Sequence, residues 1–277
     1  MLDFRVRNDR CNHCGLCVSD CPARIVQLGD DMLPFVSPEN EQNCLECQHC
    51  LAICPTAAVS VFRLNPDDSL PVSADVWPRL EQMTHLLRGR RSVRHYCDEN
   101  VDSRLIDRLL ATVANSPTGV NNRLLTFTVI ADKDELHRFR EKTMQALIKA
   151  AGEGRIPERF AYIHSAISAY VEHQADVIFR GAPHVLIVSA PPESPCATED
   201  VPIAIAYFEL LAQSAGLGTV WCGLLKLALE SAPELKPLLG LPPGHHYYAM
   251  LFGPPAIQYS RTVQRDNAAT VRRPKIS

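Results

Sequence analysis

The sequence has few of the features that mark membrane proteins and nucleic-acid-binding proteins. None of its apolar runs is long enough to span a bilayer, and aromatic residues make up only 6% of its 277 residues. The 28 Lys and Arg residues do not outnumber the 31 Asp and Glu residues. The sequence therefore lacks the excess of basic residues that would indicate binding to nucleic acid. An apolar signal core and the Gly-x-Gly-x-x-Gly fingerprint of a Rossmann dinucleotide site are also absent. We therefore expect a cytoplasmic protein with no membrane or nucleic-acid partner.

Cysteine, in contrast, is abundant and regularly spaced. Eight of the 11 cysteines fall into two runs that share one pattern, C-x2-C-x2-C-x3-C-P. The runs are Cys11-Asn-His-Cys14-Gly-Leu-Cys17-Val-Ser-Asp-Cys21-Pro22 and Cys44-Leu-Glu-Cys47-Gln-His-Cys50-Leu-Ala-Ile-Cys54-Pro55. This pattern holds cubane iron–sulfur clusters in bacterial two-cluster ferredoxins. It predicts single-electron chemistry.

The spacing also predicts which cysteines share a cluster. The three-residue gap carries the fourth cysteine of each run onto a helix that points away, so each cluster takes its fourth ligand from the other run. We predict two [4Fe–4S] clusters with the ligand sets Cys11, Cys14, Cys17, Cys54 and Cys44, Cys47, Cys50, Cys21. Paired zinc sites are the competing interpretation, because C-x2-C also suits zinc, although zinc leaves the third cysteine of each run and the two prolines unexplained. A disulfide framework is a weaker alternative in a chain without a signal core.

The cysteine runs belong to a small first domain. Residues 1–64 resemble the bacterial 2[4Fe–4S] ferredoxins, with a hairpin expected around a turn at residues 29–31. They contain five Lys and Arg against eight Asp and Glu, whereas the remaining residues hold equal numbers of each sign. A polar, turn-rich stretch follows, so we predict a ferredoxin domain at 1–64, a linker at 65–76 and a second domain at 77–277. The acidic first domain is suited to meet a basic patch, either on another protein or within the same chain.

The second domain mixes helical and strand patterns. Helices are predicted from the Asp102 cap to residue 113, and at residues 135–150, 158–179 and 200–216. Strands are predicted at residues 126–131, 183–190 and 249–252, the second of them nearly continuous in apolar side chains, as in a central buried strand. Helices interleaved with a few buried strands predict an α+β or α/β sandwich.

Three short segments of this domain suit a bound phosphate and an aromatic ring. They are Arg90-Arg91-Ser92-Val93-Arg94, Asn115-Ser116-Pro117-Thr118-Gly119-Val120-Asn121-Asn122 and Gly216-Leu217-Gly218-Thr219-Val220-Trp221-Cys222-Gly223. The first offers charge-assisted hydrogen bonds to a phosphate, the second hydroxyls and amides, and the third a close approach of backbone to a ring. Taken singly, each also has a plain structural explanation: a solvated basic helix end, a helix-to-strand turn and a helix C-cap.

In their order and spacing, the three segments resemble those of the nitroreductase family of FMN-dependent oxidoreductases, from about residue 80 onward. The whole chain is similar to the ferredoxin-fused branch of that family. The resemblance implies an α+β fold: a ferredoxin-like domain followed by a sandwich with a central, mostly antiparallel sheet flanked by helices. It also implies a homodimer with FMN bound at the interface between two copies.

The resemblance assigns roles to particular residues. The phosphate and ribityl contacts fall on Arg90, Arg91, Ser92, Arg94, Arg265 and, as a weaker choice, Arg261. The isoalloxazine contacts fall on Ser116, Pro117, Thr118, Gly119 and Asn121, and backbone contacts near the ring on Trp221, Cys222 and Gly223. The chain departs from the family pattern at Asn122-Arg123-Leu124-Leu125, where the family often has x-Gln-Pro-Trp, and at Cys222-Gly223, where an acidic or small polar residue is common. No catalytic side chain is assigned, because the chemistry is centred on the flavin.

These features predict an oxidoreductase in which the clusters relay single electrons to or from FMN. The reduced flavin would then reduce an organic acceptor of the nitro, quinone, activated-alkene or flavin class. One alternative is an electron carrier that serves a protein partner and has no small-molecule substrate. Another is an NAD(P)H-oxidising flavoprotein that uses its clusters as the electron outlet. The donor, either ferredoxin-like or NAD(P)H, stays open at this point, as does the direction of electron flow.

Overall fold

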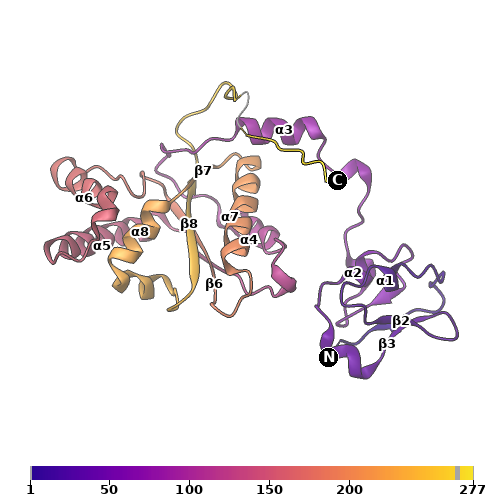
Figure 1. Cartoon of the computed structure of the whole chain (residues 1–277). Helices are drawn as coiled ribbons and strands as arrows, with labels where there is room; N and C mark the ends of the chain where they lie inside the picture. The colour runs from indigo at the N-terminus through magenta and orange to yellow at the C-terminus, as the bar shows by residue number, and fades with distance from the viewer. Residues whose placement is uncertain (1, 266–268, 277) are drawn as a thin grey trace. The chain divides into compact units, whose positions relative to one another are not determined.

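The computed structural model describes residues 2–265 and 269–276, and the chain divides into two compact units (Figure 1). Unit 1 comprises Met1–Pro78 together with the short segment Val120–Asn122, and unit 2 comprises Arg79–Gly119 and Arg123–Ser277. The division after Pro78 lies two residues beyond the predicted linker. Among the described residues, no helix is both long and apolar enough to cross a bilayer.

Unit 1 is built from short elements around the cysteine runs. Two antiparallel pairs of strands, β1 (Arg5–Val6) with β4 (Val59–Ser60) and β2 (Val26–Leu28) with β3 (Pro34–Val36), form its sheets. The second pair is the predicted hairpin around residues 29–31. The helices α1 (Leu16–Ser19) and α2 (His49–Ala52) each begin inside a cysteine run, and the short 3-10 segments are η1 (Pro38–Asn43), η2 (Pro66–Asp68) and η3 (Ala74–Val76).

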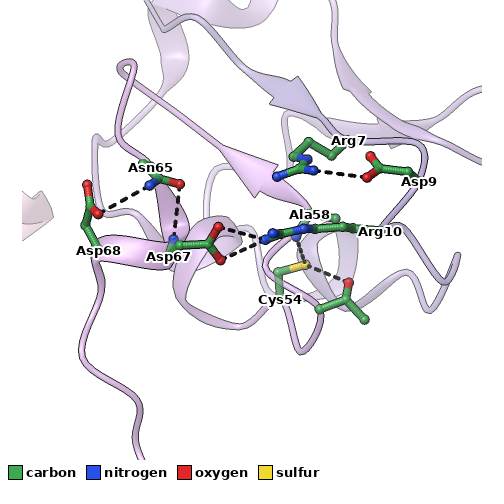
Figure 2. A network of polar contacts seen from close by, with 9 residues as sticks. Arg7, Asp9, Arg10, Cys54, Ala58, Asn65, Asp67 and Asp68 are labelled. Carbon is green, nitrogen blue, oxygen red and sulfur yellow. Dashed lines mark hydrogen bonds and ion pairs between the residues drawn. The ribbon is translucent and has the colours of Figure 1, made fainter.

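The start of the predicted linker is attached to unit 1. Arg10 Nη1 lies 2.7 and 2.9 Å from the two carboxylate oxygens of Asp67, which belongs to η2 (Figure 2). Asn65 caps η2 by accepting a hydrogen bond from Asp67 N at 3.3 Å. Residues 65–68 are therefore ordered against the cysteine-rich unit, and any free linker begins after them.

In the part of unit 2 that the structure describes, helices alternate with four strands. Its helices are α3 (Leu80–Gly89), α4 (Ser103–Val113), α5 (Lys133–Gly152), α6 (Ala161–His173), α7 (Ala197–Ser214) and α8 (Gly223–Ser231). Its strands are β5 (Thr126–Ile130), β6 (His184–Ala190), β7 (Gly218–Trp221) and β8 (His246–Gly253). The 3-10 segments η5 (Glu158–Phe160) and η6 (Pro233–Leu239) precede α6 and follow α8, while η4 (Gly119–Asn121) crosses the division between the units.

The four strands form one antiparallel sheet in the order β5-β6-β8-β7. Because successive side chains of a strand point to opposite faces, β6 divides its residues between two cores. Val185 and Ile187 pack with α5, α6 and α8, whereas Leu186 and Val188 pack with α4 and α7. The helices accordingly lie on both sides of the sheet (Figure 1). This is the predicted α+β sandwich.

Two predicted elements differ from the structure. The single helix expected at residues 158–179 is wrong: α6 ends at His173, because Gln174 adopts a left-handed conformation (φ 54°) that stops the helix. Without a glycine or proline at that position, the sequence gives no stop signal. The last strand is longer than predicted, because Tyr247 and Tyr248 continue the ladder that pairs β8 with β6.

Candidate functional sites

The eight cysteines of the two runs gather in the two predicted sets. One cavity of unit 1 is lined by Cys11, Cys14, Cys17 and Cys54, and another by Cys21, Cys44, Cys47 and Cys50. Each set therefore surrounds a cavity and takes its fourth member from the other run. The cysteines of each predicted set thus lie around one cavity, and a donor set of four thiols around a space fits a cubane cluster.

The thiols of both sets are close enough to influence each other's ionisation. Burial raises the pKa of Cys50 to about 12, and the neighbouring Cys44, Cys47 and Cys21 act in the same direction. Burial likewise raises the pKa of Cys17, with Cys54, Cys14 and Cys11 adding to the effect. Four such thiols stay ionised together only when a cation such as a cluster's iron holds them.

Backbone N–H groups already point at some of these sulfur atoms. Ala58 N donates to Cys54 Sγ at 3.2 Å (Figure 2). Thr56 Oγ1 lies 3.7 Å from the same sulfur. Burial acts to raise the pKa of Cys54, but these hydrogen bonds outweigh it, so the pKa lies below its usual value. Hydrogen bonds to ligand sulfur are one of the means by which a protein sets a cluster's potential.

In unit 2, the first and third predicted segments lie side by side. Ser92 forms a parallel bridge with Thr219, and Val93 N donates to Thr219 O at 2.9 Å. Gly218 permits this approach, since a Cβ there would lie 2.8 Å from the side-chain carbons of Val93. The arginine-rich segment thereby runs along β7, although more than 120 residues separate the two in sequence.

One open cavity of about 400 Å³ lies beside this junction. Its lining includes Arg94 from the first segment and Trp221, Cys222 and Gly223 from the third, together with Tyr162 and Arg180. The volume falls within the roughly 300–1,000 Å³ of small-molecule sites, and a small number of polar groups on apolar walls is typical of them. A Cβ atom at position 223 would lie 3.0 Å from the hydroxyl oxygen of Tyr248, so a glycine avoids crowding at this wall of the cavity.

A buried carboxylate connects the two segments behind the cavity. Glu209 of α7 is 6% exposed; its Oε1 lies 3.3 Å from Arg90 Nη1, and its Oε2 accepts a hydrogen bond from Trp221 Nε1 at 3.2 Å. Trp221 also packs edge-on against Tyr248. The guanidinium of Arg90 is therefore paired with a buried carboxylate, whereas Arg94 is exposed at the cavity and donates a hydrogen bond from Nη1 to Ser92 O at 3.2 Å.

The second predicted segment is fixed to α4 and α7. The hydroxyl of Ser116 donates to Val113 O at the end of α4, and Gly119 N donates to Asp200 Oδ1 of α7 at 2.9 Å. A Cβ at Gly119 would lie 2.5 Å from Cys196 Sγ, so only glycine fits there. Thr118 Oγ1 accepts a hydrogen bond from Arg123 N at 3.0 Å, and Pro117 is exposed. None of these residues lines the cavity beside β7.

The remaining predicted contacts are dispersed. Asn121 falls in unit 1, and the neighbouring Val120 adopts φ 50°, a left-handed conformation that is rare for a β-branched residue. Arg91 Nη2 donates to Arg88 O at 2.9 Å, while its Nε is buried without a partner among the described residues. Arg261 and Arg265 are exposed beyond β8 and do not line the cavity.

Cys222 is a buried thiol. Its side chain is 5% exposed, and its Sγ donates to Ile178 O at 3.4 Å. Burial raises the pKa of Cys222 to about 12 and outweighs the opposing effect of the nearby Arg180 guanidinium. The thiol therefore stays protonated at neutral pH, which disfavours a role as a reactive nucleophile.

Sequence reasoning missed Glu209, Asp200 and Arg180. Glu209 carried a usable signal, because it is a lone acid within the apolar run that forms α7. Asp200 lies in the first turn of the same helix, where acids are ordinary. Arg180 carried no signal beyond the glycine that follows it.

An antiparallel sheet covered by helices on both faces, joined to a unit with two four-cysteine cavities, defines a two-part redox protein. Comparison with known families agrees with this class. Residues 87–253 match the model of the nitroreductase family, and residues 10–59 match that of a 4Fe-4S dicluster domain. Because the first match covers more than half of the chain, the protein belongs to the nitroreductase family.

Individual relatives are more distant. Human iodotyrosine deiodinase 1 is 26% identical over 205 residues, which are 66% of this chain and 66% of the human protein. Zebrafish iodotyrosine deiodinase is 35% identical over 68 residues, 24% of this chain and 23% of that protein. The chain thus spans less than two thirds of the length of these curated relatives.

Solved structures share the fold of unit 2. A nitroreductase with bound FMN from Bacteroides fragilis superposes with a TM-score of 0.55 at 21% identity, covering 69% of this chain and 99% of that one. An FMN-dependent nitroreductase from Mycobacterium smegmatis in complex with NADPH gives 0.51 at 20% identity, covering 71% and 100%. At these identities the likeness establishes the fold.

Proposed function

We propose that the protein is an FMN-dependent oxidoreductase whose two [4Fe–4S] clusters relay single electrons to or from the flavin. The observation that carries the proposal is the cavity of unit 2, where Arg94 meets Trp221, Cys222 and Gly223 at the junction of two segments expected to contact FMN. The FMN bound in the Bacteroides fragilis nitroreductase supports the same cofactor here. When bound, FMN exchanges electrons singly or in pairs and passes on a hydride, which a cluster does not.

In this proposal the chain's own residues position the flavin. Ser92, Arg94, Arg91 and Arg265 hold the phosphate and ribityl chain, with Arg261 as a weaker candidate, and Arg90 braces the segment through its ion pair with Glu209. In the homodimer proposed below, the isoalloxazine ring would take further contacts from the second copy, through Ser116, Pro117, Thr118, Gly119 and Asn121, which do not line the cavity of their own chain. The backbone of Trp221, Cys222 and Gly223 would contact the ring's reactive edge, where oriented N–H groups other than that of Cys222, which donates to Ala249 O, would stabilise developing charge.

The clusters are held by the two cysteine sets of unit 1: Cys11, Cys14, Cys17 and Cys54 bind one, and Cys44, Cys47, Cys50 and Cys21 bind the other. Such ligands require reduced thiols, so we place the protein in the cytoplasm. The electron donor is a ferredoxin-like protein or NAD(P)H. The NADPH complex of the Mycobacterium smegmatis nitroreductase supports the second possibility.

We further propose a homodimer with FMN at the interface. Helix α3 supports it, because it buries none of its residues within the chain although Leu80 and Leu87 are apolar and 76% and 51% exposed. An amphipathic helix whose apolar side chains stay this exposed in its own chain is suited to pack against a second copy.

The acceptor is a small organic molecule of the nitro, quinone, activated-alkene or flavin class. A second candidate is an iodinated phenol such as iodotyrosine, because the curated relatives described above are iodotyrosine deiodinases. That reaction replaces the carbon–iodine bond by carbon–hydrogen; it uses two electrons from the reduced flavin and one proton, and it releases iodide. A carrier with no small-molecule acceptor is the remaining alternative.

An anaerobic absorbance titration of the purified protein tests the proposal. NADH, NADPH and dithionite are added separately, and flavin and cluster bands are followed. Bleaching by a pyridine nucleotide would identify it as the donor, whereas bleaching by dithionite alone would point to a ferredoxin-like donor. Reoxidation by nitrobenzene, menadione or iodotyrosine then identifies the acceptor class. A protein without bound flavin after reconstitution with FMN would contradict the proposal.

A further inference from the structure

The cavity beside β7 carries two positive charges, and only one of them belongs to a residue predicted to contact the flavin. Two guanidinium groups line it, those of Arg94 and Arg180, and no Asp or Glu among the described residues does. Arg94 comes from the segment after α3. Arg180 comes from the turn that precedes β6, a part of the chain to which no flavin contact is assigned.

The turn that presents Arg180 is rigidly held from one side. Arg180 and Gly181 both adopt left-handed conformations, with φ of 57° and 67°. The carboxylate of Asp176 accepts hydrogen bonds from Phe179 N at 2.8 Å and Gly181 N at 2.9 Å. Arg140 Nε lies 3.0 Å from the same carboxylate and completes the anchor.

A second anchor joins the turn to the wall of the cavity. Cys222 Sγ donates to Ile178 O at 3.4 Å, and Cys222 N donates to Ala249 O of β8 at 2.8 Å. Ile178 and Cys222 are both buried. The turn is therefore held between α5 and the end of β7, two residues from the arginine that it presents.

The side chain of Arg180 is left available. Within the part of the chain that the structure describes, its guanidinium has no hydrogen bond and no ion pair, and the residue is half-buried. A left-handed conformation in a residue other than glycine costs free energy and persists where the surroundings enforce it, often at binding sites. Arginine's planar array of donors matches the two oxygens of a carboxylate or phosphate.

We propose that Arg180, together with Arg94, binds an oxyanion of a small molecule seated in this cavity. The oxyanion is either the phosphate of FMN or a carboxylate or phosphate carried by the electron acceptor. The identity of these two sources rests on the proposed function. The binding of an oxyanion by Arg180 and Arg94 does not, because it follows from the charge of the cavity and the fixed turn.

Three variants of the full-length protein test the assignment. Arg180→Gln removes the charge and Arg180→Lys retains it, and both keep a Cβ, so the backbone cost of φ 57° is unchanged. Arg108→Gln is the matched control, because Arg108 is exposed on α4 and does not line the cavity. All three are made in a Trp77→Phe background, in which Trp221 of the cavity wall is the sole tryptophan.

The first measurement needs no flavin. Inorganic phosphate is titrated into flavin-depleted protein while the fluorescence of Trp221 is followed. We expect Arg180→Gln to weaken phosphate binding about tenfold or more, Arg180→Lys to retain part of it and Arg108→Gln to match the parent. This result supports the inference even if the protein proves to bind no flavin, an outcome that contradicts only the proposed function.

Two further measurements distinguish the sources. If Arg180 holds the phosphate of FMN, Arg180→Gln weakens FMN about tenfold or more and leaves riboflavin, which lacks the phosphate, unchanged. If it holds an acceptor, FMN affinity is unchanged, while KM rises about tenfold for nitrobenzoate and not for nitrobenzene. The inference is overturned if Arg180→Gln and Arg108→Gln agree in phosphate binding, in FMN affinity and in both KM values.

Discussion

Trp221 donates its indole N–H to Glu209 at 3.2 Å, and the other oxygen of that carboxylate lies 3.3 Å from Arg90. One buried acid thus fixes both the wall of the cavity and the segment expected to hold the flavin phosphate. A buried carboxylate persists only with such partners, because its desolvation is costly. Removal of this carboxylate is therefore expected to disturb both the cavity wall and the arginine-rich segment.

Glu209→Gln is expected to lower the free energy of unfolding of unit 2 by about 1–3 kcal/mol, since Arg90 loses its counter-charge and is only partly exposed to water. Urea denaturation followed by Trp221 fluorescence in the Trp77→Phe background measures the change. Glu141→Gln, on the exposed face of α5, is the control and is expected to shift stability by less than about 0.5 kcal/mol. Equal stabilities of the two variants would contradict the bracing role.

Arg94→Gln is expected to weaken FMN retention about tenfold while leaving the cluster absorbance intact, because its guanidinium is exposed at the cavity. The flavin-to-protein ratio after gel filtration, read beside the cluster band, measures both. Arg108→Gln should retain the parent's ratio. An unchanged flavin content in Arg94→Gln would remove this residue from the phosphate site.

Cys17→Ala is expected to lower the iron and sulfide content by about half, because one of two clusters loses a ligand. It should also slow flavin reduction by low-potential donors. Cys97→Ala, outside both cysteine sets, is the matched control and should keep the full iron content. Unaffected flavin reduction in Cys17→Ala would show that this cluster is not on the path to the flavin.

Stability is expected to fall with pH below about 6.5 through His184. This side chain is fully buried in β6, and its Nε2 accepts a hydrogen bond from Val101 N at 2.9 Å. Burial lowers the pKa of His184 in the folded state, so the unfolded chain takes up the proton first and stability is lost as pH falls through the ordinary pKa of 6.5. His184→Gln keeps an acceptor without titrating.

Unfolding of the parent and of His184→Gln between about pH 7.5 and pH 5.5 measures this contribution. The parent is expected to lose more stability over that interval, by at most about 1.4 kcal/mol per pH unit. Because burial also lowers the pKa of His246, His246→Gln serves as the comparison for a less buried imidazole. Identical pH slopes in the parent and His184→Gln would rule His184 out as the source.

Gly218→Ala is expected to cost about 1–3 kcal/mol and to reduce FMN retention, because the new methyl group would lie 2.8 Å from Val93 and push the arginine-rich segment off β7. Gly152→Ala in α5 meets nothing within 4 Å and should be neutral or stabilising. Adding Val93→Ala to Gly218→Ala should restore part of the flavin content. Failure of that rescue would mean that the close approach of the two segments does not matter for FMN.

The parts of the molecule that could be predicted are those set by residues close together in the sequence. The proposed ligand sets of the clusters follow from spacing within 12-residue runs, and the same two sets of cysteines line the two cavities of unit 1. The fold class followed from the apolar β6 and the amphipathic α4. These features depend on neighbours in sequence, which the chain displays directly.

The parts that escaped prediction depend on distant partners. Arg90 and Glu209 are 119 residues apart, and neither residue reveals the other. The early end of α6 rests on a left-handed Gln174, a conformation that the sequence does not announce. The position of Arg180 at the cavity depends on Asp176 and Cys222, which fix its turn through contacts formed only in the folded chain. Contacts of this kind arise from packing and carry no periodic signal.

The small core of unit 1 has a consequence for the cell. Its buried apolar cluster consists of Leu2, Ile25, Val26, Leu51, Val59, Val61 and the predicted ligand Cys17. Such a core is too small to stabilise a fold without help, so metal binding and folding are coupled. Unit 2 has two larger cores of its own. Iron shortage or oxygen damage is thus expected to unfold unit 1 while unit 2 persists, so that iron supply would set how many chains hold both units folded.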